Sequence, residues 1–99
     1  MSSGNTLTFT APFNLIGTFS SPNISYTWDA TGTIDSYNYY RSTSTMNTES
    51  MPTATATGIT TKSYTDTTAS TNETYYVRFG SMKDGVEKIS DEITVNTTI

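Results

Sequence analysis

The side chains that most enzymes use for chemistry are missing from this 99-residue chain, which contains neither histidine nor cysteine. Without them there is no disulfide, no thiolate nucleophile, no imidazole base and no ordinary zinc, haem or iron–sulfur ligand. Serine and threonine are abundant, but a hydroxyl nucleophile would here need a lysine as its base. Lys62, Lys83 and Lys88 occur in patterns typical of strand edges and turns. We therefore expect no enzyme and no catalytic residue.

The balance of charge excludes further classes of partner. Nine acidic and five basic residues give a net charge of −4. Binding to the phosphates of a nucleic acid needs a basic stripe, which five scattered cations cannot form. No stretch approaches the roughly 18 apolar residues of a membrane span, and the first residues lack the basic and apolar segments of a signal peptide. The sequence predicts neither a nucleic-acid partner nor a membrane partner.

The composition favours a small β-protein with an aromatic core. Seven Tyr, four Phe and one Trp compensate for a shortage of aliphatic residues, and each buried aromatic removes about 150–250 Å² from water. Threonine is β-branched and therefore favours a pleated strand over a helix. Only three prolines are present, which argues against a disordered, proline-rich stalk. We expect one folded domain with threonine on its faces.

Alternation of apolar and polar residues with a period of two predicts strands along the whole chain. The clearest runs from Tyr75 to Phe79, where Tyr75, Val77 and Phe79 share one face. Turn residues separate the strands every 8–12 residues, as expected for an antiparallel immunoglobulin-like sandwich of seven strands. The seven predicted strands are 15–19, 24–28, 37–41, 53–57, 61–66, 75–79 and 89–95.

Residues 12–97 resemble a fibronectin type III domain in the order and spacing of several motifs. The motifs are Asn14-Leu15 after Pro12, Trp28-Asp29-Ala30, Ser36 to Arg41, Tyr64-Thr65-Asp66 and Thr74 to Phe79. The resemblance implies an all-β, seven-stranded sandwich. Residues 1–11 then form an N-terminal arm or extra strand, and residues 98–99 form a C-terminal tail.

The resemblance also assigns particular residues. It makes Tyr75 the tyrosine corner, whose hydroxyl bonds back to the preceding loop. The family usually has leucine six residues earlier, where this chain has the smaller Ala69. The turn at Asp84-Gly85 stands where some members carry an Arg-Gly-Asp tripeptide, so integrin recognition by that route is excluded.

Four carboxylates are expected at one pole of the resembled fold. They belong to Asp29, Asp35, Asp84 and Glu87, and carboxylate oxygens are typical calcium ligands. The sequence has no calcium-loop motif, and acidic residues are common in solvated loops. We expect no metal and no cofactor.

A candidate interaction surface lies on the outward face of the third and sixth predicted strands, which are neighbours in the resembled fold. Its residues are Asn38, Tyr40, Tyr76 and Arg78. Exposed Tyr and Arg are enriched at protein-binding hot spots and serve as platforms for sugars. The alternative is a cross-strand aromatic pair that only stabilises the sheet.

A candidate docking arm lies outside the family match. In residues 6–11, Leu7 and Phe9 alternate with threonine, and an exposed apolar strand tends to pair with a sheet edge. The arm either extends its own first strand past Pro12 or adds to the sheet of a neighbouring subunit.

Together these features predict a non-enzymatic structural or binding module. Its expected partners are proteins, chiefly neighbouring subunits of an assembly, and a carbohydrate ligand stays open. The first hypothesis is a virion component, a phage head decoration or tail protein, because virions assemble in the cytoplasm without a signal peptide. The second is an extracellular spacer or adhesion module of a secreted bacterial polysaccharide-degrading enzyme or adhesin. An engineered binder fits less well, because its loops should be rich in Tyr, Ser and Trp.

Overall fold

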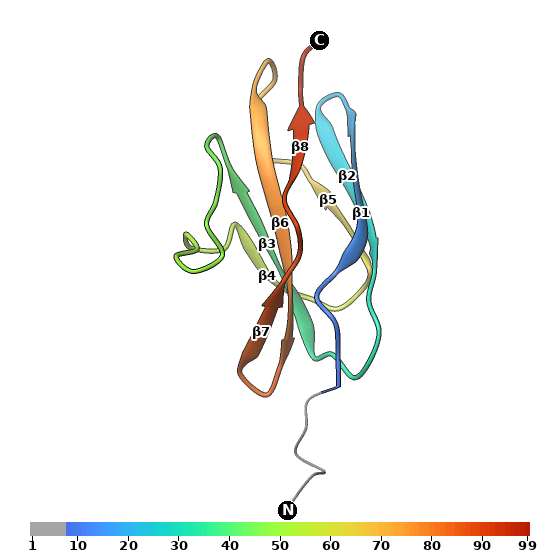
Figure 1. Ribbon diagram of the computed structural model, residues 1–99. Coiled ribbons are helices and arrows are strands. Elements are labelled where there is room, and N and C mark those ends of the chain that lie inside the picture. The colour runs from blue at the N-terminus through green and yellow to red at the C-terminus, as the bar shows by residue number, and fades with distance from the viewer. Residues whose placement is uncertain (1–7) are drawn as a thin grey trace, which may run out of the picture.

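Two antiparallel β-sheets packed face to face make up the protein (Figure 1). The computed structural model describes residues 8–99. The strands are β1 (Phe13–Ser20), β2 (Asn23–Asp29), β3 (Ser36–Ser42), β4 (Ala56–Ile59), β5 (Ser63–Asp66), β6 (Thr74–Lys83), β7 (Val86–Ile89) and β8 (Ile93–Asn96). Across this described part, no helix is long and apolar enough to cross a membrane.

The strands divide three to five between the sheets. One sheet has the order β1-β2-β5, and the other has the order β4-β3-β6-β7, with β8 also pairing with β6. Strand β6 is long enough to hold both final strands, because its first residues pair with β8 and its last residues pair with β7. The predicted fold class, an all-β antiparallel sandwich, is confirmed.

Aromatic rings from both sheets fill the space between them. Tyr26 and Trp28 of β2 meet Tyr39 of β3 and Phe79 of β6, all of them buried. The ring centroids of Trp28 and Phe79 lie 4.3 Å apart, and those of Tyr39 and Phe79 lie 4.9 Å apart. These separations suit favourable ring–ring contacts. The residues that alternate with these rings on β2 are polar, whereas those on β3 and β6 include Tyr40 and Arg78.

The predicted strands at residues 53–57 and 89–95 differ most from the structure. Strand β4 begins at Ala56 and extends to Ile59, which is buried opposite Tyr37, whereas residues 53–55 precede the strand. The predicted last strand is divided at residues 90–92, so residues 8–99 form eight strands instead of seven. At the break, the Ser90 hydroxyl accepts a hydrogen bond from the Phe79 N–H at 3.0 Å. A side chain thus replaces one backbone partner.

The loop between β5 and β6 is held by the tyrosine corner. The Ser70 N–H donates to the Tyr75 hydroxyl at 2.9 Å, which confirms the predicted bond, and Ala69 packs against the core. Thr97 adds a second attachment, since its fully buried hydroxyl donates to the Ser70 carbonyl at 2.8 Å and accepts from the Glu73 N–H at 2.9 Å. The end of the chain therefore fastens this loop.

Candidate interaction surface

The four residues of the predicted surface do share the outer face of the five-stranded sheet. Tyr40 of β3 lies opposite Arg78 of β6, and Tyr76 lies opposite Ser42 in the same ladder. Asn38 stands two residues before Tyr40 and therefore on the same face. The predicted neighbourhood of β3 and β6 is present, and the surroundings of each side chain decide how much of it can meet a partner.

Tyr40 is not exposed, so the expectation of an exposed Tyr40 is wrong. It is only 6% accessible, and its hydroxyl donates to both carboxylate oxygens of Glu87, at 2.7 and 3.0 Å. The Asn38 amide donates to the same carboxylate at 2.9 Å. Burial and the bond to Glu87 raise the pKa of Tyr40 to about 12. Tyr40 and Asn38 thus form an internal polar cluster with Glu87 on the outer sheet face.

A glycine leaves room for the Glu87 carboxylate. Gly80 of β6 lies opposite Asn38 on one side and Ile89 on the other. A Cβ added at Gly80 would collide with the Glu87 carboxylate. Any larger residue at Gly80 would therefore displace Glu87 and separate it from Tyr40 and Asn38.

Arg78 is engaged by the protein's own backbone. Its guanidinium donates to the Ser90 carbonyl at 2.7 Å and to the Met46 carbonyl at 3.2 Å. Its Nε lies 3.6 Å from the Glu92 carboxylate, which also accepts from the Met46 N–H at 2.8 Å. Arg78 therefore joins the β7–β8 break to the loop that follows β3. The sequence did not indicate this role, because both carbonyl partners belong to loops.

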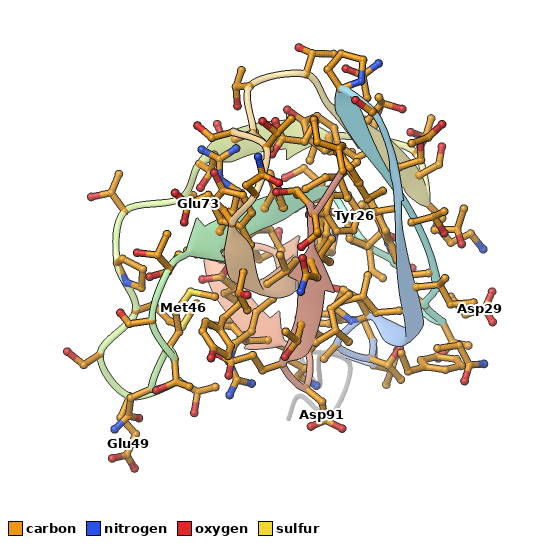
Figure 2. The ribbon with its side chains drawn as sticks, turned by 90° about the horizontal axis from the view of Figure 1, so that it is seen from above. Tyr26, Asp29, Met46, Glu49, Glu73 and Asp91 are labelled. Atoms are coloured by element: carbon orange, nitrogen blue, oxygen red, sulfur yellow. The ribbon has the colours of Figure 1, made fainter. Side chains whose placement is uncertain are left out.

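The loop of residues 43–55 covers part of the predicted surface. Met46 on this loop is buried, whereas Glu49 near its tip points into solvent (Figure 2). Tyr76 is half-buried and has no hydrogen bond from its hydroxyl within the described residues 8–99. Of the two predicted tyrosines, Tyr76 is therefore the one that stays partly accessible.

The arm residue Phe9 packs on its own domain. It is buried, forms an antiparallel bridge with Gly32, and its carbonyl accepts from the Lys88 ammonium at 2.9 Å. The ammonium also lies 4.4 Å from the centre of the Phe9 ring, a favourable cation–π contact. The bridge continues, past Pro12, the line on which β1 pairs with β2. Leu7 lies outside the described residues.

The four carboxylates expected at one pole, those of Asp29, Asp35, Asp84 and Glu87, have separate partners. Asp35 accepts from the Asp84 N–H at 3.1 Å and lies 3.4 Å from the Lys83 ammonium. The bond from the Asp84 N–H lowers the pKa of Asp35. Glu87 is held by Tyr40, and Asp29 accepts from Asn14. In residues 8–99 no three histidine, cysteine or acidic side chains are grouped closely enough to hold a metal ion.

An ion pair at the sandwich interior was missed by the sequence analysis. Asp66 of β5 is 1% accessible and accepts from Arg41 at 2.6 Å and from the Tyr39 hydroxyl at 2.7 Å. Its second oxygen accepts from the N–H and the hydroxyl of Thr68, both at 2.7 Å. Burial alone would raise the pKa of Asp66, but these hydrogen bonds outweigh it and the pKa is lowered.

The signal for this pair was present in the alternation. Asp66 stands two residues after Tyr64, and Arg41 stands two residues after Tyr39, so each charge occupies a position of an inward face. Opposite charges at inward positions of two strands are expected to meet, because an unpaired buried charge is costly.

Comparison with known proteins shows a similarity to a solved structure. No family model and no curated protein sequence matches the chain. A similar solved structure is the crystal structure of a Fn3-like protein from Clostridium thermocellum, with a TM-score of 0.75 and 33% sequence identity. The alignment covers 86% of this chain and 88% of that protein.

Proposed function

The chain belongs to the fibronectin type III-like family, and from this we propose that it is a non-enzymatic structural and binding module. The observation that carries the proposal is the sandwich shared with the Fn3-like protein over most of both chains. The polar groups inside the sandwich support it. Tyr26, Tyr39, Arg41 and Asp66 bind one another, so their hydrogen-bonding capacity serves the fold.

Exposed apolar side chains on an edge strand favour action through protein contacts. Strand β1 is at the edge of its sheet, and on it Phe13 is 41% and Ile16 is 59% accessible. Edge strands with apolar side chains are natural places for another chain to dock. We propose that the partners are neighbouring subunits of a virion, in which the module decorates a phage head or forms part of a tail.

The second candidate is a spacer or adhesion module of a secreted bacterial polysaccharide-degrading enzyme or adhesin. Two observations favour it. The similar Fn3-like protein comes from a bacterium. The first described residues also lie at the pole of the β6–β7 turn, whereas Ile99 lies at the opposite pole (Figure 1). A domain entered at one pole and left at the other can separate two neighbours along a line.

The location of the protein decides between these candidates. We expect quantitative mass spectrometry of density-purified phage particles to detect the chain at a fixed copy number per particle, and immunogold labelling to place it on the head or tail. Its recovery from the culture supernatant, joined to a polysaccharide-degrading domain, would support the second candidate and refute the first. The non-enzymatic assignment would be refuted if an activity that hydrolyses a polysaccharide remained with the 99-residue chain through several purification steps.

A further inference from the structure

The first and last strands are irregular at the same place along the sandwich. In β1 the pairing with β2 shifts between Phe13 and Ile16, and Asn14 adopts a positive φ of 52°. On the other sheet, β7 and β8 are separated by residues 90–92. Irregularities in edge strands open the ladder locally and redirect side chains. Here the two irregularities leave a space between the sheets.

This space is a small pocket with three kinds of wall. It has a volume of about 240 Å³ and is lined by residues 12–15 on one side and by Ser90, Asp91 and Ile93 on the other. Leu15 and Ile93 are half-buried against the core and form its apolar part. Phe13, 41% accessible, and the exposed Asp91 also line the pocket, and we refer to these two residues as its aromatic and its anionic wall. Figure 2 shows Asp91 at the periphery of the molecule, away from the packed interior.

The anionic wall is not neutralised by the residues that the structure describes. Within residues 8–99 the ion pairs involve Asp35, Asp66, Asp84 and Glu92, and none of them involves Asp91. Lys88, three residues before Asp91, is committed to the carbonyl and ring of Phe9. An incoming cation would thus find an available carboxylate, on a protein whose net charge is −4.

The size and chemistry of the pocket specify its occupant. A volume of about 240 Å³ is below the roughly 300–1,000 Å³ of small-molecule sites, so the pocket suits a single side chain. An ammonium or guanidinium group would pair with Asp91 and contact the face of the Phe13 ring. The aliphatic stem of the same side chain would lie against Leu15 and Ile93. An anion would be repelled, and a metal ion would find one exposed carboxylate.

We propose that this pocket binds a lysine or arginine side chain of a partner protein. The proposal rests on the proposed function as a protein-binding module and adds the chemistry of the partner. Contact between the partner and the domain then begins where the β1 bulge, with Phe13, and the β7–β8 break, with Asp91, line the same pocket.

The test is an NMR titration of the full 99-residue chain. The probe is the peptide acetyl-Gly-Ser-Arg-Ser-Gly-amide, and its matched control carries citrulline, which has the shape of arginine without the charge. We expect the arginine peptide to shift the amide signals of residues 13–15 and 90–93, and the citrulline peptide to bind at least threefold more weakly. Equal binding of the two peptides, or shifts confined to other residues, would overturn the proposal.

Paired variants separate the two walls. Asp91→Asn should weaken arginine-peptide binding about threefold to fivefold, as for a surface ion pair, whereas Glu49→Gln removes a distant exposed carboxylate and should leave binding unchanged. Phe13→Ala should weaken binding about tenfold. Its control, Ile16→Ala, removes an exposed apolar side chain of β1 that does not line the pocket and should leave binding unchanged. Unchanged affinity in Asp91→Asn would refute the anionic role. Shifts at the same amides with a neutral oligosaccharide, but not with the arginine peptide, would assign the pocket to sugar.

These outcomes are distinct from those of the proposed function. If the chain is found in phage particles but its pocket does not bind the arginine peptide, only the proposal for the pocket is refuted. If the pocket binds the arginine peptide but the chain is absent from phage particles, the virion assignment is refuted and the proposal for the pocket is still supported.

Discussion

Asp66 is the centre of a polar network inside the sandwich. Its carboxylate is buried, yet four donors from Arg41, Tyr39 and Thr68 surround it. Tyr26 extends the network, because its hydroxyl lies 2.8 Å from that of Tyr39. A buried ion pair contributes little net stability over an apolar replacement, but removal of one partner strands the other charge. The loss of one member of the network should therefore destabilise the fold more than the intact network stabilises it.

We expect Asp66→Asn to lower the free energy of unfolding by about 2–4 kcal/mol at pH 7, because Arg41 loses its counter-ion and Tyr39 its acceptor. The pKa of Asp66 is lowered in the folded state. Its contribution is thus complete above the unfolded-state pKa of about 3.9 and is lost as the pH falls through the folded-state pKa. The difference in stability between wild type and variant should begin to shrink below about pH 4 and disappear below the folded-state pKa. Urea unfolding followed by the fluorescence of Trp28, the single tryptophan, measures both effects.

Asp91→Asn is the matched control for this variant, since it removes an exposed carboxylate. Its stability at pH 7 should stay within about 0.5 kcal/mol of wild type. If the difference between Asp66→Asn and wild type were the same at pH 3 as at pH 7, the role given to the Asp66 charge would be wrong.

Thr97 supports a separate prediction, because its hydroxyl is the second attachment of the β5–β6 loop. Thr97→Val keeps the shape of the side chain and leaves the Ser70 carbonyl and the Glu73 N–H without this partner. The expected cost is about 1–3 kcal/mol, with faster hydrogen exchange at the Glu73 amide. The control Thr98→Val changes the exposed neighbouring residue, and its Glu73 amide hydrogen should exchange at the wild-type rate.

At the scale of elements, the docking of the arm depends on Gly32. This residue has a φ of 92°, and a Cβ there would collide with the Thr8 carbonyl. Gly32→Ala should therefore release Phe9 from its place beside Lys88. We expect a loss of about 3–5 kcal/mol, from the backbone cost and the exposure of Phe9 together, and rapid protease cleavage between residues 8 and 12.

Gly85→Ala isolates the backbone cost. Gly85 has a φ of 80°, and a Cβ there would meet nothing within 4 Å. This variant should lose about 1–2 kcal/mol and keep its arm protected from protease. Equal protection of the arm in both variants would show that Phe9 docks without the close approach at Gly32.

The strands that alternation predicted well are those with large apolar residues on one face. Ile24, Tyr26 and Trp28 of β2 are all buried, and so are Tyr75, Val77 and Phe79 of β6. Alternation was a poor guide at residues 53–57, where alanine and threonine differ little in the apolar surface that they bury. The pairing of Ile59 opposite Tyr37 decided the position of β4 instead, and such long-range contacts leave no mark in a local pattern.

The predicted surface shows the same limit at the scale of the whole molecule. The alternation along the strands correctly placed Tyr40 and Arg78 on an outer sheet face. Tyr40 is nevertheless buried there. Glu87, 47 residues away in sequence from Tyr40, and the loop carrying Met46 both fold over that face. The exposed apolar residues Phe13 and Ile16 lie on β1 instead. The side of the molecule available to partners was therefore determined by how loops and edge strands pack.

Deletion of residues 1–11 tests whether the domain folds without its arm. Phe9 is buried beside Lys88 and Gly32, outside the main aromatic cluster of the core. The truncated chain should therefore fold, with a free energy of unfolding lower by about 1.5–3 kcal/mol, the value of burying one phenylalanine. Urea unfolding monitored at Trp28 measures this loss, and the point variant Phe9→Ala should reproduce most of it.

Light scattering on the full-length chain and on the chain without residues 1–11 decides where the arm docks. Because Phe9 occupies a site on its own domain, we expect the full-length and truncated chains to be monomers of one domain each. A full-length dimer that dissociates on truncation would show that the arm of one copy reaches the sheet of another. In that case Gly32→Ala should also dissociate the dimer, since the same glycine would receive the arm of the second copy.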